Sequence, residues 1–490
     1  MLRHEEDRRI YERSARLILL LAMRDICPGA KVRIEHSIGQ GVYMNVSGVS
    51  LTAALVQRIE KRMRELAEAD LPITKSRWTR SQAMDYFAAQ GQKDTVRLLG
   101  YRPFEHFDVY TCDGLSEYFY GDMAASTGKI QSFALRFHYP GMVLLLPGDD
   151  LSGAPAPFAE RPQLMRTYAE ANEHSRILQC ESAADLNDII ARGEARTFIR
   201  VNEALQERAI AQIAERIIAR GARVVFIAGP SSSGKTTFAN RLSIQLRVSG
   251  KHPVAISLDD YYLNREDVPL GPDGTPDLEC LESIDVPLFN EQLIDLLDGR
   301  EVELPRYSFY TKRREELGVR MRMGRDDILI VEGIHGLNDA LSCDIPSELK
   351  FRVYVSALTQ LNLDCHNRIR TTDVRLMRRM VRDNRTRATN ALETMQMWDK
   401  VRAGEEKYIF PFQERADVMF NTSLLYEIAV LKKYAYPLLH AIGKDSPYYT
   451  RSRRLCKFLH YFKDLDEESE IPPTSILREF IGGCSFYDET

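Results

Sequence analysis

Short, continuous runs of apolar residues alternate with amphipathic stretches throughout the second half of the chain. Such runs are typical of strands in a parallel sheet that helices cover on both faces, whereas a strand with one solvated face alternates apolar and polar positions. The pattern therefore predicts an α/β fold with a doubly wound parallel sheet over about 223–440. The runs are RVVFIAG (223–229), PVAISL (253–258), DILIVEG (327–333) and FRVYV (351–355).

The first part of the chain mixes strand-like and helical patterns, which predicts an α+β domain over 31–146. A hairpin is expected for 31–48, where two β-rich segments flank a glycine-containing turn. Helical spacing follows over 53–69, and 133–149 is again β-rich and ends in turn residues. The apolar run 17–23 is far short of the ~20 residues that a membrane span needs, so we interpret it as the buried face of an amphipathic helix.

Between and beyond these parts the composition changes. Pro, Gly and Ala are concentrated at 147–162, which predicts a connector. The stretch 163–222 is mostly helical in pattern and includes an amphipathic helix over 203–220 that ends at Gly221. In the tail we expect one further helix over 453–465. The chain is thus predicted to divide into 1–146, 147–222, 223–440 and 441–490.

Composition changes this picture little. The 490 residues are 44% hydrophobic and 28% charged with a net charge of −4, which is typical of a soluble globular protein and gives no global cationic surface for nucleic acid. Eight scattered cysteines without a CxxC pair favour reduced thiols and a cytoplasmic location. We expect no membrane and no nucleic-acid partner, with a tRNA kept as an alternative. Homo-oligomerisation, which is common among soluble enzymes, stays open.

The strongest motif is GPSSSGKT at 229–236, which matches the phosphate-binding pattern G-x-x-x-x-G-K-[ST] between an expected strand and an expected helix. Glycines allow close backbone approach to phosphates, and the helix N-terminus adds partial positive charge. Lys235 is predicted to reach the β- and γ-phosphates of ATP, and the Thr236 hydroxyl to bind Mg²⁺. The predicted nucleotide-binding residues are Gly229, Ser231, Ser232, Ser233, Gly234, Lys235, Thr236 and Thr237.

Carboxylates follow two of the expected strands. Asp259 and Asp260 come after PVAISL, at the sheet edge where ligands bind, so Asp259 can take the proton of an attacking hydroxyl; a helix N-cap or a solvated pair is the alternative. Glu332 ends ILIVE and suits a carboxylate acting on Mg²⁺, the alternative being a loop acid beside Gly333.

The segment 368–387 holds eight arginines and two acids. Arg375, Arg378 or Arg379, and Arg382 recur at helical spacing, which predicts a lid helix that covers the transferring phosphoryl group and excludes water. A solvated basic face or a nucleic-acid patch is the alternative interpretation.

Together these motifs resemble the uridine kinase/phosphoribulokinase family over roughly 223–440. The resemblance rests on GPSSSGKTT, SLDDYY, LPRYSFYTKRR, ILIVEGIHGL and RLMRRMVRDNRTR, in this order. It implies ATP-dependent phosphorylation of a hydroxyl, with the 5′-hydroxyl of a nucleoside such as uridine or cytidine as the acceptor. It also implies roles for particular residues: Asp259 as catalytic base with Lys235 and Arg382, Tyr261 at the acceptor, Glu279 on the ribose, Tyr307 and Lys312 at the base, and Arg379, Arg385 and Arg387 on the nucleotide.

Two departures from that family affect the acceptor. Glu279 stands where uridine kinases carry Asp, and Lys312 stands where they carry a His that reads the base. Lys only donates hydrogen bonds, whereas neutral His can donate or accept. A sugar phosphate or another non-nucleoside acceptor is therefore one alternative, and an RNA-binding protein switched by ATP is another.

The first part of the chain resembles the editing domain of threonyl-tRNA synthetases over roughly 31–146, in IGQGVYMNV, ADLPITKSRWTRSQAMDYF and SEYFYGDMAASTGKIQSFAL. The metal and editing residues of that domain do not carry over. Phe119 and Met123 stand in its C-x-x-x-H segment, and Glu12 to Arg16 reads ERSAR in place of H-x-x-x-H. Phe and Met cannot act as ligands of hard ions or as bases. The resemblance therefore implies a catalytically inactive scaffold for ligand binding, RNA contact or assembly.

Overall fold

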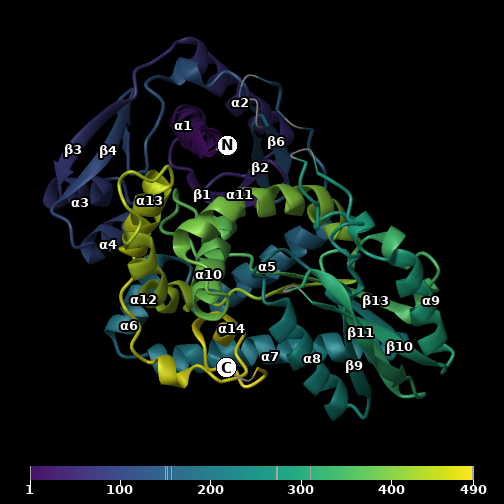
Figure 1. Cartoon of the computed structure of the whole chain (residues 1–490). Coiled ribbons are helices and arrows are strands. Elements are labelled where there is room, and N and C mark those ends of the chain that lie inside the picture. The colour runs from purple at the N-terminus through teal and green to yellow at the C-terminus, as the bar shows by residue number, and fades with distance from the viewer. Residues whose placement is uncertain are drawn as a thin grey trace.

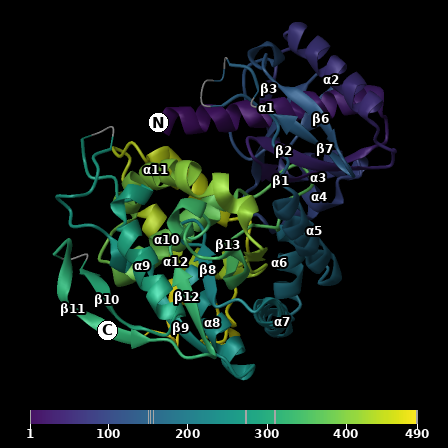
Figure 2. The same cartoon turned by 90° about the vertical axis from the view of Figure 1, so that its right-hand side faces the viewer.

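The structure is a computed structural model that describes residues 2–148, 151, 153–155, 157–271, 274–308 and 311–487. Parts of the predicted connector 147–162, of the LPRYSFYTKRR motif and of the tail fall outside these residues. We call residues 2–148 the N-terminal part and residues 224–487 the C-terminal part. Figure 1 shows the N-terminal part above the C-terminal part, and Figure 2 shows the helices that join them at the right-hand side.

The N-terminal part contains two antiparallel sheets and four helices. Most of it packs around a core of its own, but Phe87, Leu98 and Val109 belong to the core that it shares with the C-terminal part. The predicted hairpin, the helix after it and the later β-rich run are all confirmed. The sheets have the strand orders β1-β2-β7-β6 and β3-β4-β5. The elements are α1 (Leu2–Ile26), β1 (Lys31–Ile38), β2 (Gly41–Ser47), α2 (Ala53–Glu68), β3 (Thr74–Thr79), α3 (Arg80–Ala89), α4 (Lys93–Tyr101), β4 (His106–Cys112), β5 (Leu115–Glu117), β6 (Ala134–His138) and β7 (Gly141–Leu145).

The apolar run 17–23 lies within α1, but it does not form only one buried face of that helix. Every residue from Leu17 to Met23 is buried, because α1 runs through the interior of the N-terminal part. The expectation of an amphipathic helix with one buried face is therefore wrong for this stretch. Among the residues that the structure describes, no helix has the length and hydropathy of a membrane span.

Three helices connect the two parts, as the pattern over 163–222 predicts. They are α5 (Pro162–Ile177), α6 (Ala183–Ala191) and α7 (Ala195–Arg220). Gly221 ends α7 in the left-handed conformation, with φ of 72°, a conformation that glycine adopts without a Cβ clash.

The C-terminal part is built on a parallel sheet with the strand order β14-β13-β8-β12-β9, which confirms the α/β expectation. A separate hairpin, β10–β11, stands beside it. The strands are β8 (Val224–Ala228), β9 (His252–Ser257), β10 (Glu301–Ser308), β11 (Arg313–Arg322), β12 (Asp327–Glu332), β13 (Lys350–Ser356) and β14 (Val418–Asn421). The helices are α8 (Lys235–Val248), α9 (Val286–Leu297), α10 (Thr371–Thr386), α11 (Ala391–Tyr408), α12 (Glu427–His440), α13 (Tyr449–Leu459) and α14 (Arg478–Ile481).

The tail helix lies earlier than predicted. It is α13, which ends at Leu459 rather than near 465. The side-chain amide of Asn187 on α6 donates to the Tyr461 carbonyl (2.8 Å) and accepts from the Lys463 N–H (2.8 Å). These bonds satisfy the backbone after the helix in a non-helical conformation, so a tertiary contact overrides the local helical preference.

Candidate active site

The phosphate loop, Gly229–Thr236, joins the end of β8 to the start of α8. Its two glycines are required by its geometry. A Cβ on Gly229 would lie 1.9 Å from the Val355 carbonyl oxygen, and a Cβ on Gly234, whose φ is 83°, would lie 2.5 Å from the Ile476 side chain. Ser232 also adopts a positive φ, 56°. Positive φ values at Ser232 and Gly234 turn the loop just before the N-terminus of α8, as an anion nest requires.

The polar atoms of this loop fit a phosphate chain. The hydroxyls of Ser232 and Ser233 are buried and have no hydrogen-bond partner among the residues that the structure describes. Lys235 donates from Nζ to the Gly229 carbonyl at 3.0 Å, so its ammonium lies across the mouth of the loop. Because buried polar groups are rarely left without a partner, the orphaned hydroxyls beside the lysine ammonium indicate a site that a ligand completes.

The expected magnesium residues lie together at the end of β12. Thr236 donates from its hydroxyl to Glu332 Oε1 at 2.7 Å, which brings two oxygen ligands to one point. The described residues contain no cluster of three or more His, Cys, Asp or Glu side chains that would hold a metal alone. This donor set fits Mg²⁺, which is commonly held by one or two protein oxygens together with substrate phosphates.

Asp259 lies at the end of β9, in the short helical turn Leu258–Tyr261. Its carboxyl can be reached from solvent, yet protein surrounds most of it, and this desolvation raises its pKa. The charge of Lys235 opposes that rise, and the neighbouring Asp260 adds to it. Desolvation likewise raises the pKa of Glu332, and Lys235 again opposes the rise.

Glu279 brings a further carboxylate to the same place. Burial raises its pKa, and the charges of Arg379 and Lys235 lower it. A Cβ on Gly404 of α11 would lie 3.1 Å from Glu279 Cγ, so glycine leaves room for this side chain. The positive charge of Lys235 thus lowers the pKa of all three carboxylates, Asp259, Glu279 and Glu332.

The other expected acceptor residues lie in different surroundings. Tyr307 is buried at the end of β10, 5.6 Å from the Tyr262 ring centroid, and its N–H donates to Asp260 Oδ1 at 3.3 Å. Tyr261 is buried too, and its hydroxyl donates to Gln292 at 2.8 Å, inside the fold. Lys312 lies exposed at the β10–β11 turn, with a φ of 59°.

The arginine segment forms helix α10, but its arginines contact different parts of the protein. Arg379 donates to the Ser231 hydroxyl at 2.8 Å, so it lies directly against the phosphate loop. Asp383 is buried and shared by Arg379, Arg382 and Arg387, at 3.1, 2.8 and 3.7 Å. Arg385 donates to the Glu479 carbonyl at 3.3 Å.

Two arginines that the spacing placed on the lid face are instead buried. Arg375 pairs with Glu405 and donates to the Ser231 carbonyl (2.9 Å), and Arg378 pairs with Glu427. These pairs anchor α10 to α11 and α12 rather than covering a phosphate.

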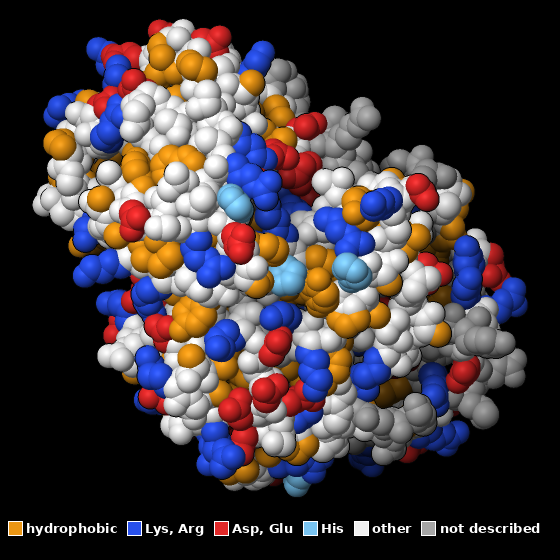
Figure 3. Space-filling view, turned by 90° about the vertical axis from the view of Figure 1, so that its left-hand side faces the viewer, with side chains coloured by type: hydrophobic (Ala, Val, Ile, Leu, Met, Phe, Trp, Pro, Cys, Tyr) orange, Lys and Arg blue, Asp and Glu red, His pale blue; other side chains and the backbone are white. Residues whose placement is uncertain are grey.

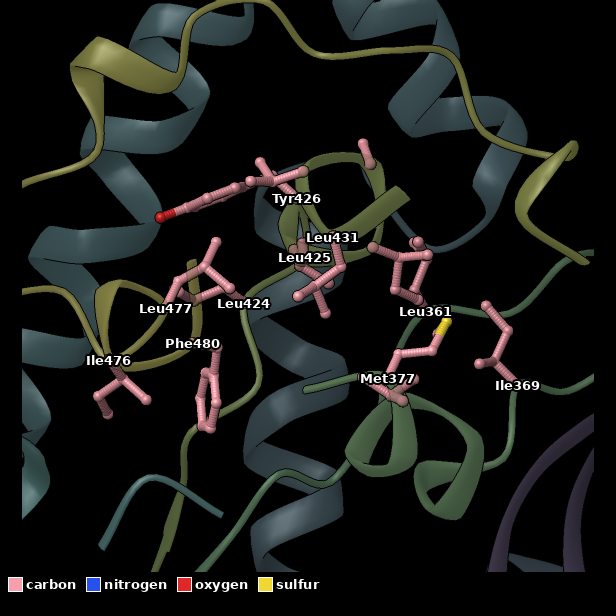
Figure 4. Packing of buried hydrophobic residues seen from close by; sticks show 14 of the residues in the cluster. Leu361, Ile369, Met377, Leu424, Leu425, Tyr426, Leu431, Ile476, Leu477 and Phe480 are labelled. Atoms are coloured by element: carbon pink, nitrogen blue, oxygen red, sulfur yellow. The ribbon is translucent and has the colours of Figure 1, made fainter. Parts of the chain in front are cut away.

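The tail forms a wall of this site that sequence reasoning missed. Thr237 donates from its hydroxyl to Glu479 at 2.7 Å, and the Tyr487 hydroxyl lies 3.3 Å from the Thr237 hydroxyl oxygen. Figure 4 shows Leu477 and Phe480 packed beside Leu424 in the shared core, which fixes the tail in place. No motif marked these residues, because they lie more than 200 positions after the loop that they contact.

The positions of the N-terminal part that lack editing residues also cluster. The Arg16 guanidinium lies 5.6 Å from the Phe119 ring centroid, and Met123 packs against the same core. Glu12, one turn before Arg16 on α1, is buried against Arg368 of the C-terminal part (3.1 Å). This cluster is filled by the chain's own side chains.

Comparison with known proteins agrees with this geometry. Residues 224–428 match the model of the phosphoribulokinase/uridine kinase family. This segment is a kinase domain of that family. A uridine kinase of Lactobacillus johnsonii is 28% identical over 197 residues, which cover 40% of this chain and 84% of that protein. The C-terminal part therefore holds a P-loop kinase domain, and the chain is a phosphotransferase that acts on a small molecule.

The N-terminal region of the kinase chain matches a different class of protein. A threonine–tRNA ligase of Methylobacillus flagellatus is 32% identical over 135 residues, which cover 27% of this chain but only 21% of the ligase. The chain thus spans about a fifth of the length of such ligases. The expected fusion of the two resemblances is confirmed. A solved structure described as a possible uridine kinase from Bacillus stearothermophilus is 22% identical, with a TM-score of 0.30 over 43% of this chain and 97% of that one.

Proposed function

We propose that this kinase transfers the terminal phosphoryl group of ATP to the 5′-hydroxyl of a nucleoside. The observation that carries the proposal is the place of Asp259 just after β9, at the sheet edge that also holds the phosphate loop, with the Lys235 charge acting on both Asp259 and Glu279. One carboxylate there can accept a proton, and another can accept hydrogen bonds from sugar hydroxyls. The relative named uridine kinase supports this choice of acceptor.

In this proposal Asp259 takes the proton of the 5′-hydroxyl while the hydroxyl oxygen attacks the γ-phosphorus. The bond from that phosphorus to the β–γ bridging oxygen breaks, and ADP leaves. Lys235, Arg379 and Arg382 stabilise the negative charge of the transferring group by position and electrostatics. Thr236 and Glu332 would hold Mg²⁺, which when bound neutralises charge on the phosphate oxygens.

The charge of the acceptor side favours a neutral acceptor. In our proposal Asp259, Asp260 and Glu279 border the acceptor, and burial is the largest cause of the raised pKa of each. An acceptor that already carries a phosphate would be repelled by these groups, whereas a nucleoside would not. In our proposal Glu279 binds the ribose, and Tyr307 lies against the base with Tyr261 supporting the turn. Lys312, at the exposed hairpin turn, approaches the base edge.

The test is ADP release with Mg·ATP across nucleosides, sugar phosphates and other hydroxylated cofactor precursors, with Lys235→Ala as the blank. The proposal predicts turnover with one class of nucleoside and only blank-level release with sugar phosphates. Turnover with a sugar phosphate alone would replace the nucleoside by that acceptor. ATP binding without turnover on any acceptor would contradict the proposal and direct the search to tRNA binding.

A further inference from the structure

The segment that leads from β13 into the arginine helix is held by the N-terminal part. We call this segment, Asn362–Asp373, the strap. The Asn362 side chain donates to the Ile34 carbonyl at 2.7 Å, and the Ile34 N–H donates to the Cys365 carbonyl at 2.8 Å, so the strap lies against the edge of β1. Asn367 donates to the Tyr118 carbonyl at 2.8 Å. These bonds join residues about 250 to 330 positions apart in the sequence.

Buried ion pairs also connect the strap to the N-terminal part. Arg9 on α1 contacts both carboxylate oxygens of Asp373, at 3.0 and 2.8 Å, and Arg454 on α13 contacts it at 2.8 Å. Glu12, one turn further along α1, pairs with Arg368 and also with Arg370. Burial would raise the pKa of Asp373, but Arg454 and Arg9 lower it well below its ordinary value, so it stays ionised.

Asp373 lies in the first turn of α10, and Arg379 lies less than two turns further along the same helix, against the phosphate loop. A helix of this length is stiff, so the anchor at Asp373, together with the pairs of Arg375 and Arg378, sets where Arg379 and Arg382 lie. The N-terminal part therefore contacts the reaction site through α10, although no residue of it that we have described touches the phosphate loop.

We propose that the N-terminal part positions the arginines of α10 for nucleotide binding, with Arg9 and Asp373 as positioning residues. The domain that resembles a tRNA-editing unit then holds helix α10, the predicted lid helix, in position. This proposal rests on the proposed function in one respect, which is that ATP is the nucleotide. Its test therefore measures the affinity for ATP and not turnover.

The experiment is isothermal titration of Mg·ATP into the full chain. Asp373→Asn and Arg379→Ala are each expected to weaken ATP binding by about tenfold, the size of one lost charge-assisted hydrogen bond. If Asp373 acts through Arg379, the double variant binds no more weakly than Arg379→Ala alone. Effects that multiply in the double variant, or an Asp373→Asn variant with wild-type affinity, would overturn the proposal.

Controls separate positioning from loss of structure. Arg9→Gln leaves Asp373 paired with Arg454, so the fold should hold while ATP affinity falls by a few-fold. Tyr461→Phe removes the hydroxyl that bonds Tyr118, at the same joint but away from α10, and should bind ATP within twofold of wild type. Should Asp373→Asn fail to fold, the cycle of Arg9→Gln with Arg379→Ala decides. Failure of the wild type to bind ATP would refute the proposed function instead.

Discussion

The phosphate loop and the strap both bury polar groups, but they differ in whether the chain itself supplies hydrogen-bond partners for those groups. In the loop, the hydroxyls of Ser232 and Ser233 have no partner among the described residues. In the strap, the Asn367 amide donates to the Tyr118 carbonyl, and its oxygen accepts from the Tyr120 N–H at 3.4 Å. Because an unpaired buried polar group is costly, the loop is a place for a ligand and the strap is a joint within the chain.

Removing the proposed catalytic base at the ligand site should have the greatest effect on activity. Asp259→Asn should lower kcat by about 10³-fold, within the range of general-base catalysis, because the amide cannot take the hydroxyl proton. Calorimetry should find its Mg·ATP affinity within a few-fold of wild type. A variant with nearly full kcat would show that Asp259 is not the base.

Shortening a side chain that joins the strap to the N-terminal part should lower the stability of the fold. Asn367→Ala removes the hydrogen bonds of its side chain with the Tyr118 carbonyl and the Tyr120 N–H, and it should lower the free energy of unfolding by about 1–3 kcal/mol. Urea denaturation followed by circular dichroism measures this change. Unchanged stability would mean that water replaces the Asn367 amide, and it would contradict the statement that the strap holds the two parts of the chain together.

The matching truncation in the loop should leave stability intact. Ser233→Ala removes a hydroxyl that bonds no described protein atom, so the free energy of unfolding should change by less than about 0.5 kcal/mol. The affinity for ATP should fall by several-fold, because a buried donor for a phosphate oxygen is lost. The contrast with Asn367→Ala fails if Ser233→Ala destabilises the fold and leaves ATP affinity unchanged.

The smallest expected effect is a shift in pH dependence. A base must be ionised, so activity is lost as pH falls through the pKa of Asp259. Desolvation and the charge of Asp260 both raise that pKa, so Asp260→Asn should move the acid limb of kcat/KM to lower pH. A pH profile of both proteins measures the shift, and movement of the limb to higher pH would contradict the assignment.

Local patterns predicted the parts of the fold that neighbouring residues determine. The apolar runs that became β8, β9, β12 and β13 and the glycine pattern of the phosphate loop were all visible in the sequence. Strand β14 was not, because its four residues are too short to show a period. The division of the chain into four units and the roles of the site residues stay predictions.

Pairings between distant residues could not be read from the sequence. Helical spacing placed Arg375 and Arg378 on the lid face, but Glu405 and Glu427 bury them from 30 and 49 positions away. The strap and the tail wall at Glu479 are of the same kind, since local sequence carries no signal of the partner. Figure 3 shows acidic and basic side chains interspersed over one face, which agrees with the small net charge but identifies no partner.

ADP formation from Mg·ATP and a nucleoside, measured in parallel for the wild type, Asp259→Asn and Lys235→Ala, decides whether the chain is a nucleoside kinase with Asp259 as its base. The proposed function predicts turnover that depends on the nucleoside in the wild type and ADP release near the blank level in both variants. It also predicts that Asp259→Asn still binds ATP. Release that depends on the nucleoside and persists in Asp259→Asn, or that is absent from a wild type able to bind ATP, would contradict it.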